Sequence, residues 1–313
     1  MTTLAALIVL FHPSKEELAH AVSLRTHCSS MLAIDNSPQP DAEAAAVLGA
    51  SDVPLVHNGN RGGIAGALNR GLAQLFAAGA DAVVLFDQDS SPSPEFFEVM
   101  RDRCGMLGAQ PFLLGPRIYD DNEKRFLPEI VIDGVLVRRL RLDPGTRAQR
   151  CSFLISSGCV VSRRAFEKLG TFVESLFIDH VDTEYCFRAL LHDVPLYVIP
   201  QLVLPHRIGN KRRHRFGPFM LTSENHAPTR RYYTARNAMY IALKYGMRFP
   251  VAFSPNLWTL WQALQVLLFE TDKIAKLRSI FMGVADGLFG QLGPLETARP
   301  AWAAWLAHRV RRE

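Results

Sequence analysis

The strongest candidates for chemistry in this sequence are two aspartates separated by one residue. Asp87 and Asp89 lie in the segment Asp87-Gln88-Asp89-Ser90, directly after an apolar run. Two carboxylates with this spacing on a turning chain can reach one divalent cation, because Mg²⁺ and Mn²⁺ prefer oxygen ligands and complete their shell with phosphate oxygens. The same pattern fits a surface turn in which Asp87 is only a cap, so the alternative stays open at this point.

A second acidic group lies further along the chain. Asp179, Asp182 and Glu184 stand close together beside aromatic residues. A carboxylate in a partly apolar wall can take a proton from an incoming hydroxyl, so this segment is a candidate for a general base. The structural alternative is that Asp182 caps the helix that follows and that Glu184 pairs with Arg188.

A glycine-rich stretch, residues 58–71, follows a predicted strand and opens a predicted helix. Glycines there let the backbone approach a ligand, and a helix N-terminus favours an anion. The glycine spacing, G-x-x-G-G-x-x-G, is not the G-x-G-x-x-G of dinucleotide-binding folds, and the sequence contains no G-x-x-x-x-G-K-[ST]. The alternative is a turn that only permits tight packing of a helix on a strand.

Two single residues could also contact a ligand. Asp35 ends the second predicted strand and could accept the imide N–H of uracil or thymine in a charge-assisted hydrogen bond. It could equally form a local Asx turn. His206 ends another apolar run and could offer a neutral imidazole to a metal ion, or it could be structural.

The first half of the chain alternates apolar runs with helical patterns, which predicts βαβ units and a parallel sheet. Strands are predicted over residues 4–10, 31–34, 54–57, 82–86 and 112–114, and helices over 14–26, 65–78 and 94–107. Later, Asp133-Gly134 predicts a hairpin turn, and more sheet is predicted over 151–155. A short strand after Gly158 and a helix from Arg163 follow. Because open α/β sheets bind ligands at the carboxyl ends of their strands, the polar residues above are expected to share one edge.

From residue 229 onward the pattern is helical. Long helices are predicted over residues 230–245, 256–269, 272–289 and 299–311, after a boundary near 210–228. Trp258 and Trp261 lie in the second of these helices, and Trp302 and Trp305 lie in the last one beside His308 and Arg309. They suit a peripheral contact with a membrane, and they suit equally well packing on the rest of the chain or a contact in a homo-oligomer.

The composition is that of an ordinary globular protein. The chain has 313 residues, 48% of them hydrophobic, and a net charge of +5. Its five cysteines include no C-x-x-C pair, and the apolar run at residues 4–11 is too short for a signal peptide, which predicts a reduced, cytoplasmic protein. The small charge excess and the lack of a reader motif exclude nucleic acid as the expected partner.

Taken in order, these motifs resemble those of the inverting GT-A glycosyltransferases of family 2, most closely bacterial rhamnosyltransferases that use dTDP-L-rhamnose. The segments that carry the resemblance are Ile34-Asp35-Asn36-Ser37, residues 58–71, Phe86-Asp87-Gln88-Asp89-Ser90, Ser157-Gly158, residues 177–188, Pro205-His206 and residues 231–237. The resemblance implies an α/β fold of the GT-A type, with a mostly parallel central sheet flanked by helices and a C-terminal helical extension. It implies a catalytic domain over 1–225, with a nucleotide-sugar half to about 115 and an acceptor half from about 116, and a helical region over 226–313.

The resemblance also implies a role for each site residue. Asp35 is expected to contact thymine, Asp87 the ribose and the metal, and Asp89 with His206 the Mg²⁺ or Mn²⁺ ion. Asp182 is expected to be the base, with Asp179 as second candidate. Further donor contacts are expected from Asn60, Arg61, Asn69 and Gln88, and diphosphate or acceptor contacts from Arg207, Lys211, Arg231, Tyr233 and Arg236.

The implied reaction moves L-rhamnose from dTDP-L-rhamnose to a saccharide or a polyprenyl-diphosphate-linked glycan in the synthesis of O-antigen or another surface polysaccharide. The enzyme is then expected in the cytoplasm or at the cytoplasmic face of the inner membrane. A donor such as UDP-galactofuranose would leave nearly the same motifs. A protein that binds a nucleotide sugar without turnover is the alternative from another class, although the intact acidic residues argue against it.

Overall fold

The computed structural model describes residues 2–28, 30–143, 145, 147–206, 212–216 and 219–310. The chain divides into two compact units. The first, here called the sheet unit, comprises Met1–Val173 and Asp182–Arg207, and the second, the helical unit, comprises Glu174–Val181 and Ile208–Glu313. The division therefore falls earlier than residue 225, and the short segment 174–181 joins the helical unit.

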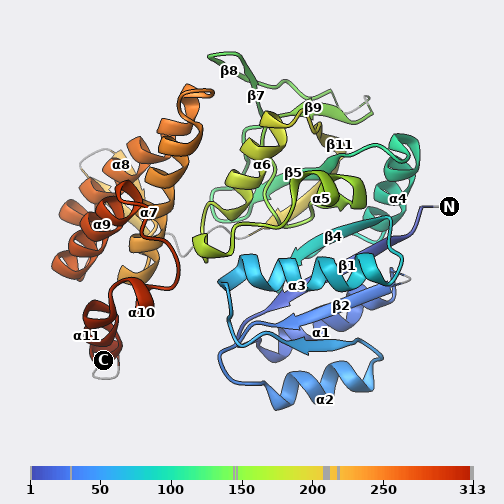
Figure 1. The fold of residues 1–313 in the computed structure, drawn as a ribbon, viewed down its shortest axis with the longest axis horizontal. Coiled ribbons are helices and arrows are strands. Elements are labelled where there is room, and N and C mark those ends of the chain that lie inside the picture. Colours follow the sequence, from blue (N-terminus) through green and yellow to red (C-terminus); the bar gives the residue numbers. More distant parts are fainter. Residues whose placement is uncertain are drawn as a thin grey trace. The chain divides into compact units, whose positions relative to one another are not determined.

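The sheet unit contains one nine-stranded sheet in the order β3-β2-β1-β4-β10-β5-β11-β9, with β6 paired to β5 (Figure 1). Its strands are β1 (Leu4–Leu10), β2 (Ser30–Asp35), β3 (Leu55–His57), β4 (Ala82–Asp87), β5 (Leu113–Asp120), β6 (Arg125–Phe126), β9 (Gln149–Cys151), β10 (Val160–Ser162) and β11 (Leu196–His206). The first four strands run parallel, as do β5 and β11, while β10 lies antiparallel between β4 and β5. Since β4, β5 and β11 point the same way, their carboxyl ends meet at one edge of a mixed sheet.

Helices cover this sheet, as the sequence predicted. They are α1 (Lys15–Arg25), α2 (Ala42–Ala50), α3 (Gly63–Ala77), α4 (Glu95–Leu107), α5 (Arg163–Leu169) and α6 (Val181–Leu191). Successive side chains of β1 point to opposite faces of the sheet. Ala6 and Ile8 pack in the cluster formed with α1, α2 and α4, whereas Leu7 faces Gly71 of α3 on the other side. The hairpin predicted at Asp133-Gly134 is confirmed as β7 (Ile130–Asp133) and β8 (Leu136–Arg139).

Helix α3 approaches the preceding loop so closely that Gly66 has no room for a side chain. A Cβ atom there would lie 2.0 Å from the backbone oxygen of Arg61. We expect Gly66→Ala to lower the free energy of unfolding by about 2–3 kcal/mol, since either the helix or the loop must move. Gly49→Ala in α2 is the matched control: its Cβ would meet nothing within 4 Å, so stability should rise by about 0.5–1 kcal/mol in the same urea titration. Equal effects of the two substitutions would contradict the close packing.

The helical unit is built from α7 (Pro228–Tyr245), α8 (Ser254–Phe269), α9 (Lys273–Leu288), α10 (Leu295–Ala298) and α11 (Pro300–Val310), which confirms the four long helices predicted. Short 3₁₀ turns precede α6 and α8, at Glu174–Leu176 and Pro250–Phe253.

The hairpin of β12 (Arg212–Phe216) and β13 (Phe219–Ser223) was not predicted. Arg207 and Lys211, which were expected to contact diphosphate or acceptor, lie outside the described residues. No helix in the described part of the chain combines the length and apolarity needed to span a membrane.

Candidate active site

Three potential metal ligands meet at the carboxyl edge of the sheet. Asp87 is the last residue of β4, Asp89 lies in the turn that follows, and His206 is the last residue of β11. One ligand atom from each lies within 4.8 Å of the others, and Nδ1 of His206 is 3.9 Å from Oδ1 of Asp89. The sheet order therefore joins two motifs that are far apart in the sequence.

The chemistry of this group fits a divalent cation. Nδ1 of His206 is buried and has no hydrogen-bond partner among the described residues. A buried imidazole nitrogen normally has a partner, and here it faces two carboxylates instead. Two carboxylate oxygens and one imidazole nitrogen form a set that suits Mn²⁺, with Mg²⁺ as the harder alternative.

The turn that carries Asp89 is fixed by buried serines. The backbone N–H of Asp87 donates to Oγ of Ser90 at 3.1 Å, and that oxygen lies 2.6 Å from Oγ of Ser157. Both serines are buried. This contact joins the aspartate motif to the Ser157-Gly158 motif, so the turn is held rather than free on the surface.

A hollow of about 460 Å³ opens beside Asp89 and His206. It is also lined by Glu17, His20 and Asp121, none of which the sequence analysis singled out. Burial lowers the pKa of His20 against the opposing effect of the Asp89 charge, which favours the neutral imidazole. Asp121 directly follows β5, but the sequence predicted this strand to end at residue 114, so no strand-end signal pointed to Asp121.

Gln88 connects the aspartate motif to the start of the chain. Its Oε1 accepts a hydrogen bond from the backbone of Phe11 at 2.7 Å, and its Nε2 donates to Oε1 of Glu17 at 2.8 Å. Through these bonds Gln88 holds the end of β1 and the first turn of α1 against the aspartate turn.

Asp35 is a buried carboxylate at the end of β2. It accepts hydrogen bonds from the backbone N–H groups of Ser37 and Asp41 at 2.9 and 3.1 Å and lies 3.0 Å from Nδ1 of His57. Burial alone would raise its pKa, but these hydrogen bonds hold the pKa below its ordinary value. The Asx turn considered from the sequence is present, and the ionised carboxylate also lines a hollow of about 490 Å³ beside α2.

The glycine-rich loop next to Asp35 is ordered by asparagine side chains. Nδ2 of Asn58 donates to Oδ1 of Asn36 and to the backbone oxygen of Arg61, each at 2.8 Å. Nδ2 of Asn36 donates to Oδ1 of Asn60 at 3.2 Å, and Asn60 adopts a φ of 54°. Arg61 remains exposed. By contrast, the amide of Asn69 is engaged at both ends by the backbone of Phe172, which ties α3 to that segment.

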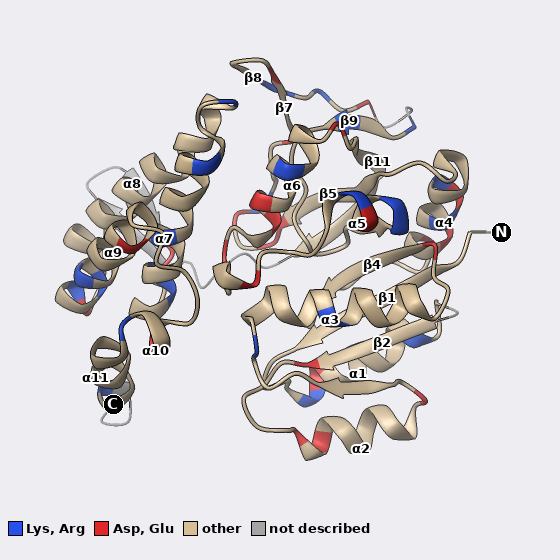
Figure 2. Ribbon diagram, viewed as in Figure 1, with Lys and Arg blue, Asp and Glu red and all other residues tan. Residues whose placement is uncertain are grey.

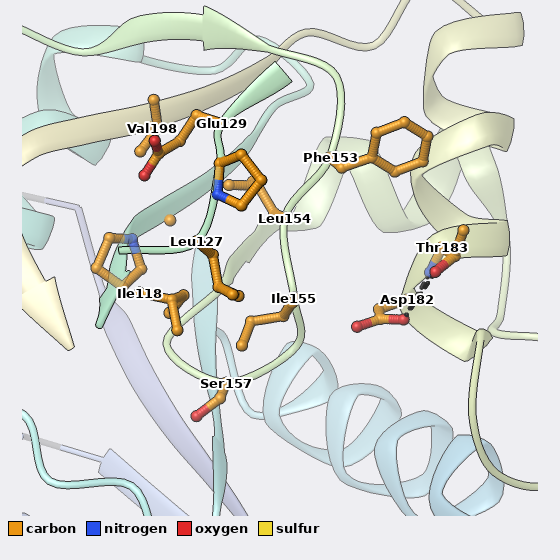
Figure 3. Close-up of a pocket in the computed structure, with 13 residues that line it drawn as sticks. Ile118, Leu127, Glu129, Phe153, Leu154, Ile155, Ser157, Asp182, Thr183 and Val198 are labelled. Atoms are coloured by element: carbon orange, nitrogen blue, oxygen red, sulfur yellow. Dashed lines mark hydrogen bonds between the residues drawn. The ribbon is translucent and has the colours of Figure 1, made fainter. Parts of the chain in front are cut away.

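Asp182 lies in the first turn of α6 and lines a mostly apolar pocket of about 200 Å³ (Figure 3). Its Oδ1 accepts hydrogen bonds from the backbone N–H and the hydroxyl of Thr183 at 2.7 and 3.3 Å. The polar lining also includes Glu129 and Ser157. The apolar wall is formed by Ile118, Leu127, Phe153, Leu154, Ile155 and Val198.

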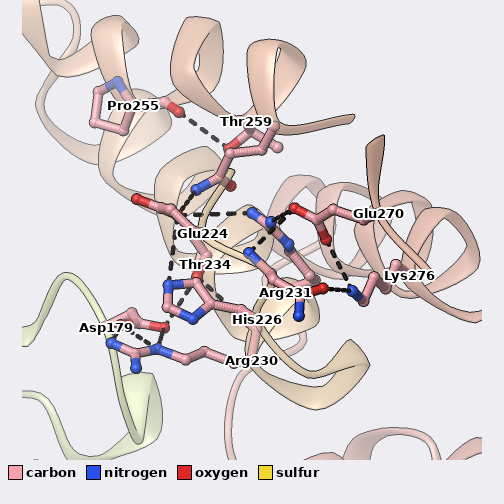
Figure 4. Close-up of polar contacts among 12 residues, drawn as sticks. Asp179, Glu224, His226, Arg230, Arg231, Thr234, Pro255, Thr259, Glu270 and Lys276 are labelled. Atoms are coloured by element: carbon pink, nitrogen blue, oxygen red, sulfur yellow. Dashed lines mark hydrogen bonds and ion pairs between the residues drawn. The ribbon is translucent and has the colours of Figure 1, made fainter. Parts of the chain in front are cut away.

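Asp179, the second candidate base, has a different environment in the helical unit. Its carboxylate accepts from Nε and Nη2 of Arg230 at 3.0–3.2 Å and from the hydroxyl of Thr234 at 2.9 Å (Figure 4). Burial would raise its pKa, but the Arg230 guanidinium and the hydrogen bonds hold the pKa below its ordinary value. A carboxylate stabilised in its ionised form in this way is a weak proton acceptor.

The segment around Asp179 is strained and is held by α7. Phe177, Asp179 and His180 have φ angles of 69°, 59° and 59°, which residues other than glycine rarely adopt. The amide of Asn237 donates to the backbone oxygens of Leu176, Ile178 and Asp179 at 2.7–2.9 Å. These contacts are within the helical unit.

Three residues expected to meet diphosphate or acceptor are buried in the same unit. Arg236 donates to the backbone oxygens of Ser175 and Leu176, and Tyr233 stacks on Phe177. Arg231 pairs with Glu270 at 2.6 Å, and Glu270 pairs in turn with Lys276 (Figure 4). The contacts described for these three residues are therefore with the interior of the unit. Buried guanidinium groups need such partners, and the sequence alone does not reveal them.

Removing the Asn237 amide should measure how firmly α7 holds the strained segment. We expect Asn237→Ala to lower the free energy of unfolding by about 2–3 kcal/mol, and the melting temperature by roughly 5–10 °C, because buried carbonyls lose their donor. Asn256→Ala is the control, since within the described part of the chain Asn256 donates to a single carbonyl, that of Ala238 at 3.0 Å, and the variant should lose about 1 kcal/mol. A smaller loss of stability in Asn237→Ala than in Asn256→Ala would contradict the idea that Asn237 holds the strained segment.

The chain is similar in sequence to known glycosyltransferases. Residues 30–170 match the model of glycosyl transferase family 2. The sequence is 28% identical over 291 residues to a dTDP-rhamnosyl transferase, RfbF, of Shigella flexneri, covering 92% of this chain and 96% of that protein.

Solved structures show the fold. TarS 1-349 of S. aureus has a TM-score of 0.55 at 10% identity, covering 92% of this chain and 81% of that one. GalNAc-T7 with UDP, GalNAc and Mn²⁺ has a TM-score of 0.51 at 13% identity, and the match covers 92% of this chain but only 57% of that chain. The predicted GT-A fold is confirmed by these similarities, which at such low identity establish the fold alone.

Proposed function

We propose that this chain, a glycosyltransferase with a family 2 domain in a GT-A fold, transfers L-rhamnose from dTDP-L-rhamnose to a saccharide acceptor with inversion at C1. One observation carries the choice of donor: the similarity to a dTDP-rhamnosyl transferase extends over 92% of the chain. The geometry of the sheet unit supports the rest of the proposal.

The donor is proposed to lie along the carboxyl edge of the sheet. Asp35, ionised and lining the hollow beside α2, would accept the imide N–H of thymine. Asp87 would contact the ribose, and Asn60 and Arg61 would contact the donor from the glycine-rich loop. Asp89 and His206, with Asp87, would hold the divalent cation. When bound, such a cation neutralises charge on the departing diphosphate.

Asp182 is proposed as the general base. It lines a pocket, its Oδ1 is oriented by Thr183, and the mostly apolar wall reduces competition from water. It would take the proton of an acceptor hydroxyl, whose oxygen attacks C1 on the face opposite the leaving dTDP. One displacement then forms the new bond to C1, breaks the bond to the diphosphate oxygen, and inverts the configuration.

The same pocket supports a deoxy sugar as the group transferred. L-Rhamnose carries a methyl group where most hexoses carry a hydroxymethyl group. Leu127, Leu154 and Ile155 offer an apolar wall close to Asp182. A hydroxyl placed against that wall would lose its hydrogen bonds to water without a replacement, which disfavours a hexose with an intact hydroxymethyl group.

The acceptor is proposed to be a saccharide linked to polyprenyl diphosphate, as in the assembly of O-antigen or another surface polysaccharide. A nucleotide-sugar donor and a lipid-linked acceptor together would place the reaction at the cytoplasmic face of the inner membrane.

The donor is tested by thermal stabilisation of the purified protein with Mn²⁺ and a panel of nucleotide sugars. We expect dTDP-L-rhamnose to raise the melting temperature more than dTDP-glucose, UDP-galactose or UDP-galactofuranose. Stabilisation by a UDP-sugar but not by dTDP-L-rhamnose would overturn the donor assignment. Binding of dTDP-L-rhamnose with no transfer to any lipid-linked acceptor would favour a protein that only binds the nucleotide sugar.

A further inference from the structure

Helix α8 presents its apolar side outward, the reverse of an ordinary surface helix. Thr259, Gln262 and Gln265 are buried, whereas Leu257 and Leu260 are each 70% exposed. A helix that packs on a core normally buries its apolar residues and leaves its polar ones in water. Only Val266 among the large apolar residues of α8 is fully buried, so packing in this unit does not account for the rest.

Hydrogen bonds fix this orientation of α8. Nε2 of Gln262 donates to Oε2 of Glu224 at 2.6 Å, and Nδ2 of Asn256 donates to the backbone oxygen of Ala238 in α7 at 3.0 Å. A rotation of the helix that buried its leucines would break the contact with Glu224, itself largely buried. The outward apolar face is therefore a stable property of the unit.

The outward face is broad and carries no charge. Helix α8 contains no lysine, arginine, aspartate or glutamate (Figure 2). The exposed side chains on it include Leu257, Trp258, Leu260, Trp261, Leu264 and Leu268. Contiguous apolar surface of this kind marks a contact with a membrane or another protein, and paired tryptophans are typical of the membrane interface.

The exposed charge of the helical unit favours a lipid surface over a second copy of the chain as the partner of α8. Among the described residues of the helical unit, the exposed charged side chains are Glu174 and Glu296 against Arg230, Lys244, Arg248, Lys273 and Arg278. Lys273, the first residue of α9, lies close to the end of α8, since its Nζ donates to the backbone oxygen of Leu267 at 2.7 Å. A dimer formed through α8 would bring two units of the same net charge together, whereas anionic lipid headgroups would attract such a unit.

We propose that α8 binds the surface of an anionic phospholipid bilayer, with its leucines and Trp258 and Trp261 inserted at the level of the headgroups. The helix would lie in the plane of the interface, and Lys273 beside its C-terminal end would contact lipid phosphates. This proposal concerns binding alone and holds whichever sugar the enzyme transfers.

Vesicle flotation of the full chain tests it. Wild type should float with phosphatidylcholine vesicles that contain phosphatidylglycerol, and less with phosphatidylcholine alone. The double variant Leu257→Glu/Leu260→Glu should lower the partition coefficient by roughly 100-fold, since it removes two inserted leucines and opposes the lipid charge. The control Val135→Glu/Leu136→Glu makes the same change at exposed apolar residues of the β7–β8 turn and should float like wild type.

Fluorescence supplies a second readout. Brominated lipids should quench the tryptophan emission of wild type, and the variant Trp258→Phe/Trp261→Phe should float but lose most of this quenching. The proposal is overturned if wild type does not float, or if the double glutamate variant floats as well as wild type. It is also overturned if light scattering shows a dimer that the glutamate variant converts to monomer while neither protein binds vesicles, because the face would then join two copies.

Discussion

Replacing Asp182 with asparagine should lower kcat for sugar transfer by about 100- to 10,000-fold, the range expected when a general base is removed. The amide keeps the shape of the side chain and can still accept the hydrogen bond from Thr183, but it cannot take a proton. Binding of dTDP-L-rhamnose should change little, because the base acts on the acceptor. The measurement is transfer of labelled rhamnose to a lipid-linked acceptor, with donor binding followed by calorimetry.

Glu129→Gln is the matched control for this substitution. Glu129 lines the same pocket but pairs with Arg117 at 3.5 Å, so its replacement should lower kcat far less than Asp182→Asn. Asp179→Asn should lower stability through the lost contact with Arg230 while leaving kcat of the folded protein much closer to that of wild type. Turnover near the wild-type rate in Asp182→Asn would remove Asp182 as the base.

Replacing Asp89 with asparagine should have the second largest effect. We expect kcat/KM to fall by about 100- to 1,000-fold, the range observed when one electrostatic stabiliser of transition-state charge is lost. The reason is that Asp89 and His206 are the ligands proposed to hold the cation at the departing diphosphate. The affinity of the purified protein for Mn²⁺, measured by calorimetry without any sugar donor, should fall in parallel.

Asp121→Asn controls for a general loss of negative charge in the same hollow. Asp121 lines that hollow but is not one of the three grouped ligands, so its replacement should leave Mn²⁺ affinity within a few-fold of wild type. Chelation of metal with EDTA should stop transfer by wild type, and added Mn²⁺ should restore it. Unchanged Mn²⁺ affinity in Asp89→Asn would contradict the metal site.

Strong periodic patterns made most of the sheet unit predictable. The buried run of β1, the Ser14 cap of α1 and the apolar run of β4 are local features, and the structure confirms each element. Helix α2 was not predicted; its alanine-rich sequence contains only two larger apolar residues, Val47 and Leu48, and buries only Ala44 and Leu48. The length of β5 was underestimated because Gly115 and Pro116, which are unusual inside a strand, interrupt its apolar run.

Partners that are distant in the sequence explain what the site analysis could not foresee. The grouping of Asp89 with His206 depends on β10 being inserted antiparallel between β4 and β5, which no local pattern shows. Arg231 and Arg236 carry the residue type expected of a diphosphate site, but Glu270 and the backbone of residues 175–176 occupy them. An arginine that stabilises the interior and one that binds an anion look the same in a sequence, because the partner alone distinguishes them.

The most direct test of the proposed reaction is the configuration at C1 of the product. Wild-type enzyme, dTDP-L-rhamnose, Mn²⁺ and a lipid-linked saccharide should give a rhamnoside whose C1 configuration, read from its one-bond C1–H1 coupling by NMR, is opposite to that of the donor. Asp182→Asn should give almost no product under the same conditions. A product that retains the donor's configuration would contradict a single displacement assisted by Asp182.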